Sequence, residues 1–253
     1  MLIAMISDRK IRILDTALKD YIKTGAPITS ERLYCEYDFG IKPAMIRLEL
    51  NDLSEAGYLV QMHHSGGRLP TDKAYRYFAS RFLEDIDFPS RSQYASTRVS
   101  TLLNWLKNDE EERFIEEVAK YLNSFGLGYA LQDSITYESG LAALFEQLQT
   151  TSRNDLLGVV RDLEKLRERV YEVSEEWFED TLWPKVFVGE NLLTKSNQLS
   201  LIAQKVDYNN SSLIVVAVGP KRMDYQKSLR LFSNLNPKKK SKKTSENYGR
   251  KRK

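Results

Sequence analysis

Residues 40–77 read GIKPAMIRLELNDLSEAGYLVQMHHSGGRLPTDKAYRY. Pro43 suits the first turn of a helix, where its missing amide hydrogen costs nothing. Ile46, Leu50 and Leu53 then recur at spacings of 4 and 3, which is typical of one buried helical face. The first half of this stretch therefore predicts a short amphipathic helix.

A tight two-stranded ribbon is expected directly after this helix. Gly57 ends the helix in the usual C-terminal way, and residues 58–63 form a short extended run. Residues 64–67, His-Ser-Gly-Gly, supply turn chemistry, residues 68–70 begin a return strand, and Thr71 can cap another helix. A short helix joined to such a ribbon predicts a winged helix-turn-helix.

The outward side of this unit carries the candidate DNA contacts. A recognition helix fits a major groove about 12 Å wide, and a wing lies on phosphates or in the minor groove. Arg47 is the best candidate for a guanine or phosphate contact, because its planar fork can bond bidentately. A small helical domain with a hairpin and no nucleic-acid ligand fits the same periodicity. The predicted DNA-contacting residues are Lys42, Ala44, Met45, Arg47, Leu48, Asn51, His64, Arg68, Lys73 and Arg76.

Two further helices are predicted before this stretch and one after it. Ser7 can cap a first helix that residues 25–27 end, and Thr29 can start a second. Residues 72–85 carry aromatic side chains at helical spacing and predict a fourth helix. We therefore expect a winged-helix DNA-binding domain over residues 1–87.

Residues 88–236 predict a second domain of mixed helices and strands. Residues 88–92, Phe-Pro-Ser-Arg-Ser, have the composition of a linker. Residues 212–220 form an apolar run rich in β-branched side chains, which predicts a buried strand. The fold class is thus α+β and mostly helical. Other helices are expected at 99–106, 110–125 and 138–148, with a last helix through 232, and residues 126–131 can begin a strand. Residues 185–191 and 200–206 are two further segments before the buried strand.

A long helix with a regular apolar stripe is expected at about residues 154–183. Its apolar positions alternate by 3 and 4 for about three heptads, the spacing of a coiled-coil seam. Such a stripe serves equally a subunit contact or packing on its own domain, and both interpretations stay open. The candidate dimerisation residues are Leu156, Val159, Leu163, Leu166, Val170, Val173 and Trp177.

The formal net charge of +3 is unevenly distributed. Residues 1–85 hold 12 Lys and Arg against 12 Asp and Glu, residues 86–236 hold 17 against 22, and residues 237–253 hold 9 against 1. The affinity of the first domain for DNA would therefore depend on a few well-placed cations. The tail 237–253 is too polar to fold alone, and is either a solubilising segment or a nonspecific DNA tether.

The sequence does not predict an enzyme, a cofactor or a metal site. It carries no Gly-rich phosphate loop, nucleophile elbow or metal-ligand cluster. Cys35, the single cysteine, excludes an internal disulfide and is expected to be buried. No run approaches the ~20 apolar residues of a membrane span, and residues 1–6 are too short for a signal peptide. We expect a cytoplasmic protein with no membrane partner.

Two sets of segments, one near each end of the chain, resemble the heat-inducible transcription repressor family, HrcA. In the first set, the run GRLPTDKAYRY at residues 67–77 is long and specific. In the second set, a Gly-Glu-Asn turn at 189–191 and the run GPKRMDY at 219–225 follow in the family's order. The resembling segments are residues 42–47, 53–59 and 64–77, and residues 185–191, 200–206 and 212–225.

The resemblance implies a GAF-like C-terminal domain and a dimeric repressor. Such repressors bind an inverted-repeat operator in double-stranded DNA upstream of chaperonin and chaperone genes. The resemblance also implies the GroEL chaperonin as a partner that maintains the active fold until unfolded protein occupies it. The stretch between Phe88 and Trp183 matches loosely, and the helix at 154–183 is the expected replacement for the family's inserted dimerisation segment.

The recognition helix departs from the family's pattern. The family usually has Ser, Thr and Asn where this chain has Lys42, Met45 and Leu48, so that Ala44, Met45 and Leu48 become candidates for contacts with thymine methyls. Two alternatives stay open. One is a winged-helix regulator of other genes, and the other is a protein–protein module that has lost specific DNA binding, which Leu48 and the neutral charge of residues 1–85 favour.

Overall fold

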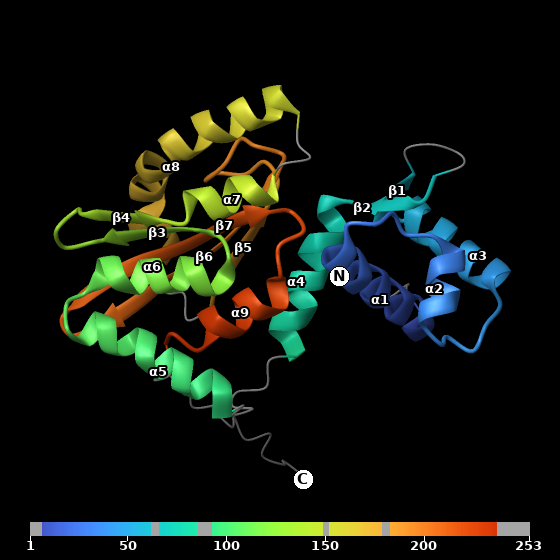
Figure 1. Ribbon diagram of the computed structural model, residues 1–253, viewed down its shortest axis with the longest axis horizontal. Helices are drawn as coiled ribbons and strands as arrows, with labels where there is room; N and C mark the ends of the chain where they lie inside the picture. Colours follow the sequence, from blue (N-terminus) through green and yellow to red (C-terminus); the bar gives the residue numbers. More distant parts are fainter. Residues whose placement is uncertain (1–6, 62–65, 86–92, 149–151, 179–182, 237–253) are drawn as a thin grey trace, which may run out of the picture.

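The computed structural model describes residues 7–61, 66–85, 93–148, 152–178 and 183–236. Figure 1 shows an N-terminal group of helices with a small ribbon beside a larger sheet that has helices on both faces. The molecule is an α+β protein, as the sequence predicts. The N-terminal helices are α1 (Asp8–Thr24), α2 (Ser30–Glu36), α3 (Pro43–Glu55) and α4 (Asp72–Asp85).

Local capping explains where the N-terminal helices begin and end. The Ser7 hydroxyl accepts a hydrogen bond from the amide of Lys10 at the start of α1, and Thr29 does the same for Arg32 in α2. Gly25 ends α1 in the left-handed conformation, with φ of 67°, which glycine adopts at little cost. The predicted starts of both helices are confirmed.

The ribbon consists of β1 (Leu59–Gln61) and β2 (Arg68–Pro70), paired antiparallel. Its second strand is also fastened to the segment before α2, because Ile28 and Arg68 exchange two backbone hydrogen bonds of 2.8 Å. The ribbon is therefore held from both sides. Of the expected turn residues 64–67, His64 and Ser65 lie outside the described part of the chain.

The larger sheet has the strand order β4-β3-β7-β6-β5, with every neighbouring pair antiparallel. Its central strand β7 is the apolar run predicted from the sequence, and residues 213–220 of it are buried. The edge strand β4 was not predicted, and Glu138, expected in a helix, lies in it. The strands are β3 (Phe125–Ala130), β4 (Thr136–Ser139), β5 (Lys185–Val188), β6 (Leu199–Tyr208) and β7 (Ser211–Pro220).

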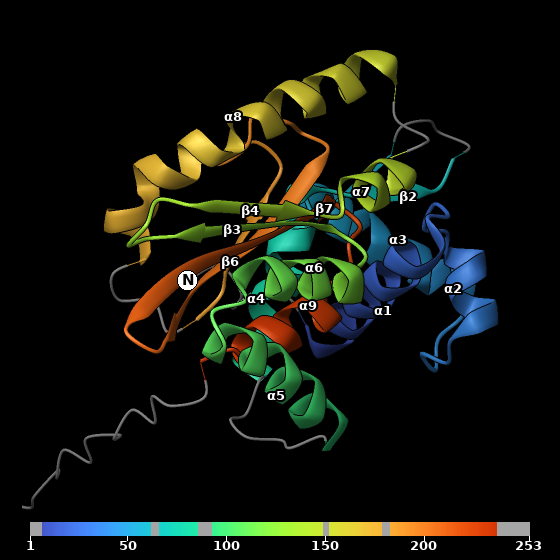
Figure 2. The same ribbon diagram turned by 60° about the vertical axis from the view of Figure 1, so that its left-hand side comes forward.

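Helices cover both faces of this sheet (Figures 1 and 2). On one face the core is continuous with the core of the N-terminal helices, so α4 packs against both parts. On the other face a separate core forms under α7 and α8. This arrangement is consistent with a GAF-like domain. The first face carries α5 (Gln93–Lys107), α6 (Glu111–Leu122) and α9 (Tyr225–Ser233), and the second carries α7 (Leu141–Gln147) and α8 (Arg153–Phe178).

Helix α6 packs so closely on β3 that Gly128 has no room for a side chain. A Cβ at this position would lie 2.6 Å from Cγ1 of Ile115. We expect Gly128→Ala to lower the free energy of unfolding by about 1–3 kcal/mol through overpacking. Urea denaturation of the full chain measures this change.

Gly158 on α8 provides the matched control. A Cβ at this position would meet no atom within 4 Å, and alanine forms helix better than glycine. Gly158→Ala should therefore raise the free energy of unfolding by about 0.5–1 kcal/mol. Changes of the same sign in the two variants would contradict this description of the packing.

Candidate nucleic-acid interface

Helix α3 has one buried and one exposed face, as its sequence predicts. Ile46, Leu50 and Leu53 are buried against α1 and α2. The opposite face is open to solvent, and its large apolar side chains are strongly exposed, Met45 at 42% and Leu48 at 54%. The exposed residues of α3 are Ala44, Met45, Arg47, Leu48, Asn51, Asp52 and Glu55, so this face also carries two carboxylates.

A buried carboxylate fixes α3 against α1. Glu49 is almost fully buried, and its Oε1 accepts a hydrogen bond of 2.8 Å from Nε of Arg9. Lys10 lies beside it and forms an ion pair of 2.6 Å with Asp52, which raises the pKa of Lys10. A buried charge costs free energy unless it is paired, so this pairing specifies where α3 sits. Sequence reasoning missed Glu49 because its partners lie about 40 residues earlier.

A second buried carboxylate fixes α2 against α1. Asp20 accepts hydrogen bonds of 2.7 and 3.1 Å from the guanidinium of Arg32 and one of 3.2 Å from the hydroxyl of Tyr37. The bond from Arg32 is the main reason that the pKa of Asp20 lies below its ordinary value. The three helices are thus held by paired charges as well as by apolar packing.

The structure gives Arg68 a different place from the one expected of a DNA contact. Its side chain is only 8% exposed, because the guanidinium turns back onto α3. There Nε donates a hydrogen bond of 3.1 Å to the hydroxyl of Ser54, and Nη2 donates to Oδ1 of Asn51. Burial, together with the nearby charge of Arg47, lowers the pKa of Arg68. Arg68 therefore braces the ribbon against α3.

Lys73 and Arg76 lie on the first turns of α4. The ammonium of Lys73 donates a hydrogen bond of 2.7 Å to the carbonyl of Ala56 at the C-terminal end of α3 and lies 4.5 Å from the ring centre of Tyr58. A cation at this end of a helix satisfies a free carbonyl and opposes the negative end of the helix dipole. Arg76 is exposed and contacts Asp72 on its own helix, with an ion-pair distance of 3.8 Å.

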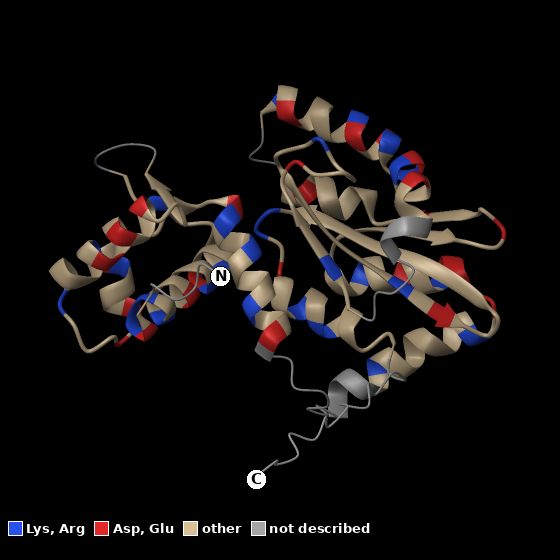
Figure 3. Cartoon of the chain, turned by 180° about the vertical axis from the view of Figure 1, so that it is seen from behind, with Lys and Arg blue, Asp and Glu red and all other residues tan. Residues whose placement is uncertain are grey.

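Lys42 and Arg47 are both exposed candidate cations of α3 and its N-terminal end. Among the described residues, the side chain of neither forms a hydrogen bond or an ion pair. Lys42 directly precedes the first turn of α3. His64 lies outside the described part of the chain. In Figure 3, residues of both signs of charge are interspersed over the N-terminal helices.

The candidate dimerisation stripe on α8 packs on its own sheet. Val159, Leu166 and Val170 are buried in the core between α8 and the strands, and Leu156, Leu163 and Val173 are partly buried against the same core. Of the two interpretations that the stripe left open, packing on its own domain is the one that these contacts support. The side chain of Trp177 lies outside the described residues.

The remaining expectations concern the cysteine, metal binding and membrane-spanning helices. Cys35 is exposed on α2, so the expectation that it is buried was wrong, since Leu33 provides the buried side chain of that short helix. Where side chains are described, no three His, Cys, Asp or Glu residues are grouped to hold a metal ion. Among the described helices, none combines the length and the apolar content needed to cross a membrane.

The sequence of this chain is similar to those of known proteins. A family model described as the HrcA protein C-terminal domain matches residues 81–229. The chain is 30% identical over 210 residues to the heat-inducible transcription repressor HrcA of Clostridium acetobutylicum, which covers 83% of this chain and 51% of that protein. For the protein of the same name from Lachnoclostridium phytofermentans, the identity is 28% over 180 residues, covering 70% and 49%. The chain thus spans about half the length of these relatives.

One solved structure shares the fold. It is described as a hypothetical protein at 2.2 Å resolution, and it aligns with a TM-score of 0.71 over 91% of this chain and 96% of its own. The sequence identity is 15%, so the likeness concerns the fold alone.

The bracing role of Arg68 makes a stability prediction. Arg68→Met keeps roughly the length and the apolar stem of the side chain but leaves Asn51 and Ser54 without their hydrogen-bond donor. Hydrogen bonds to charged groups contribute about 1.5–3 kcal/mol to the free energy of unfolding. We expect a loss of that size in the free energy of unfolding, measured by urea denaturation. Arg76→Met is the matched control, because Arg76 is exposed, and should cost under about 0.5 kcal/mol. Equal losses would contradict the bracing role.

Proposed function

We propose a function from the premise that this chain belongs to the HrcA family, as the match to the family's C-terminal domain over residues 81–229 shows. The proposal is that it is a sequence-specific DNA-binding repressor of heat-shock genes, including those of chaperones and chaperonins. The names of the relatives, heat-inducible transcription repressors, support this assignment. It is proposed as a DNA-binding regulator and not as an enzyme.

The exposed face of α3 is the observation that carries the proposal. It is a solvent-exposed face on a helix that is fixed from behind by the pairing of Glu49 with Arg9 and from the side by Arg68. A helix presented in this way, followed by a ribbon, is what a winged helix-turn-helix places in a major groove. We therefore propose that residues 1–87 act as the DNA-binding domain, with α3 as the recognition helix.

The proposed roles divide the candidate residues into two groups. Arg47 contacts a guanine or a phosphate, and Lys42 contacts a phosphate at the start of the helix. Arg68 and Lys73 position the recognition helix, as their bonds to α3 indicate. The remaining candidate contacts are Ala44, Met45, Leu48 and Asn51 on the helix, and His64 and Arg76 on the wing and α4.

An inverted-repeat operator calls for a dimer, because a two-fold symmetric protein reads a symmetric site. We propose that the second copy binds at the groove between α7 and α8, which has a volume of about 430 Å³ and is lined by Leu141, Phe145, Val160, Leu163 and Phe125 among others. Leu141 on α7 and Val160 on α8 are exposed at this groove, and Leu157 is a further exposed apolar residue of α8. Apolar side chains gathered at such a groove are typical of a protein contact.

Two further parts of the proposal rest on the family alone. The GroEL chaperonin is proposed as the partner that maintains the active repressor, so that unfolded protein releases the genes by occupying it. A repressor has to reach the chromosome, so a cytoplasmic location belongs to the same proposal.

A protein–protein module is the second candidate function. Met45, Leu48 and Val60 are all exposed apolar side chains on α3 and β1, and the N-terminal 85 residues carry no net charge. An apolar surface without a positive field suits a protein partner at least as well as DNA. The third candidate function is a regulator of other genes with the same fold. Only its operator would distinguish it from a repressor of heat-shock genes.

Selection from a pool of random duplexes tests the proposal without assuming an operator. The full chain is incubated with the pool, and bound duplexes are amplified and sequenced over several rounds. The proposal predicts enrichment of inverted repeats, with half-sites about one helical turn, 10–10.5 base pairs, or a multiple of it apart. A pool that stays random, with binding that vanishes as salt is raised, would contradict it.

The role of Arg47 makes a specific prediction. Arg47→Ala should cost about 1–3 kcal/mol in binding to the selected duplex, because a bidentate contact is lost. Lys107→Ala is the control, since Lys107 is exposed at the end of α5, away from both α3 and the proposed dimer contact. Fluorescence anisotropy titrations measure both. An unchanged affinity for Arg47→Ala would remove this residue from the interface.

The apolar residues of α3 predict that thymine methyls are read. Replacing a contacted thymine by uracil removes only the methyl group and should weaken binding by about 0.8 kcal/mol for each methyl lost. Leu48→Ala or Met45→Ala should make the protein insensitive to one of these replacements. The same replacement outside the half-sites is the control. If every thymine within the half-sites tolerates it, these side chains do not read methyls.

A further inference from the structure

The two sets of segments that identify the family meet at one place in the structure. Asp72 begins α4 directly after the ribbon, and Lys221 follows strand β7. The ammonium of Lys221 lies 2.5 Å from Oδ1 of Asp72 and donates a hydrogen bond, also of 2.5 Å, to Oδ1 of Asn197. The side chains of Asp72 and Lys221 are only 28% and 21% exposed. One lysine thus connects the N-terminal unit with the sheet domain.

Two buried tyrosines lie beneath this ion pair. The rings of Tyr75 on α4 and Tyr225 on α9 are 5.9 Å apart. The hydroxyl of Tyr225 donates a hydrogen bond of 2.8 Å to the carbonyl of Lys221 and lies 2.7 Å from the hydroxyl of Ser200. Burial raises the pKa of both tyrosines, so both stay neutral. The backbone that carries Lys221 is therefore fixed as well.

The loop after β5 packs closely against Asp72, the carboxylate of this ion pair. Gly189 follows β5 with φ of +68°, and a Cβ there would lie 2.4 Å from Oδ2 of Asp72. Only glycine combines this backbone conformation with so close an approach. The loop after β5 therefore rests directly on the first turn of α4.

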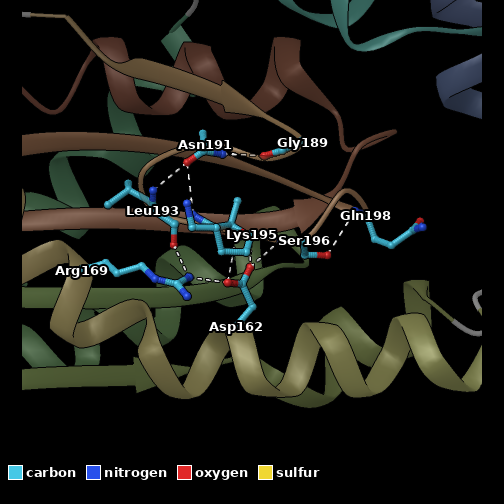
Figure 4. A network of polar contacts seen from close by, with 9 residues as sticks. Asp162, Arg169, Gly189, Asn191, Leu193, Lys195, Ser196 and Gln198 are labelled. Atoms are coloured by element: carbon cyan, nitrogen blue, oxygen red, sulfur yellow. Dashed lines mark hydrogen bonds and ion pairs between the residues drawn. The ribbon is translucent and has the colours of Figure 1, made fainter.

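That loop is itself anchored to α8, as Figure 4 shows. Asp162 on α8 is almost fully buried and accepts hydrogen bonds of 2.8 and 3.0 Å from the amides of Lys195 and Ser196. Arg169, two turns further along the same face of α8, pairs with Asp162 and donates a hydrogen bond of 3.1 Å to the carbonyl of Leu193. Asn197, which binds Lys221, is thus part of a loop held from the opposite face of the sheet.

The same turn of α4 also holds α3. Lys73, next to Asp72, binds the carbonyl of Ala56 at the end of α3. A displacement of the first turn of α4 therefore moves α3 with it. The path from α8 to α3 runs through Asp162, Asn197, Lys221, Asp72 and Lys73.

We propose that the Asp72–Lys221 pair, seated on the Tyr75–Tyr225 contact, is a joint that fixes the orientation of α3 relative to the sheet domain. In a dimer formed by the sheet domains, this orientation sets the distance between the two recognition helices. Lys221 and Asp72 are therefore positioning residues that select the separation of the half-sites. This inference rests on the proposed function for its DNA readout, but the orientation is measurable without DNA.

The DNA test compares duplexes in which the separation of the half-sites is changed by about half a helical turn, or 5 base pairs. Wild-type protein should discriminate strongly between the selected separation and the changed one. Lys221→Met and Asp72→Asn should each reduce this discrimination about fivefold, the lower end of the range for coupling between sites. The double variant should lose no more than either single variant, because both remove one interaction.

Two controls separate positioning from stability. Affinity for a duplex with a single half-site should not change in Lys221→Met, since the recognition surface is untouched. Lys195→Met provides the control lysine, because Lys195 lies in the loop that carries Asn197 with its side chain exposed, and this variant should keep the wild-type discrimination. If Lys221→Met also keeps it, the joint does not select the separation.

The DNA-free test uses Cys35, the single cysteine, which is exposed on α2. A spin label on Cys35 and a second on α8 through Glu172→Cys report the distance between the two parts of the chain, with labelled protein diluted into unlabelled protein. The distribution should be narrow in the parent and in Lys195→Met, and broader or shifted in Lys221→Met. An unchanged distribution would overturn the joint, even if DNA binding is established. Broadening together with a lack of operator binding would uphold the joint and refute the proposed function.

Discussion

Helix α4 is buried on two sides, and the rest of the molecule is arranged by this constraint. One side of it packs on α1 and the ribbon, while the other packs on α9 and β5. Tyr75 and Phe78 are both almost fully buried, in a core that continues from the N-terminal helices into the sheet domain. A helix with two apolar sides cannot leave either neighbour without exposing them to water. The part that we propose binds DNA is therefore attached rigidly through its own last helix.

Paired charges then decide the details that apolar packing leaves open. Glu49 and Asp20 orient the N-terminal helices, and Asp162 orients the loop after β5. Pairs of this kind add little net stability, but breaking one leaves an uncompensated buried charge. Together these ion pairs hold α3 in one position, with its solvent-exposed face outward. A single defined position is what recognition of base edges requires.

Sequence reasoning succeeded where the signal is local. Ser7, Thr29 and Pro43 mark helix starts by their own chemistry, and the β-branched run of β7 reads as a buried strand without knowledge of its neighbours. It failed where the partner is distant along the chain. Arg68 next to a glycine turn is typical of a phosphate contact, and nothing near it in sequence indicates Asn51 and Ser54.

Periodicity alone could not decide the partner of α8. Spacings of 3 and 4 place side chains on one face whether a second helix or a sheet covers it, and Val159 and Val170 are buried by the sheet. The strand β4 was missed for a similar reason, because a short half-exposed edge strand has no continuous apolar run. The five residues predicted for the outward face of α3, by contrast, are all exposed, since exposure follows directly from the buried face opposite. Asp52 and Glu55, which are exposed as well, were not among them.

The central claim is that α3 reads DNA sequence, and titration of the full chain tests it most directly. An HrcA-type inverted repeat is compared with a scrambled duplex of the same composition at two salt concentrations. The account predicts that the repeat is bound far more tightly and that the preference persists at the higher salt, because base contacts do not depend on counterion release. Equal binding to both duplexes that collapses as salt rises would contradict the claim.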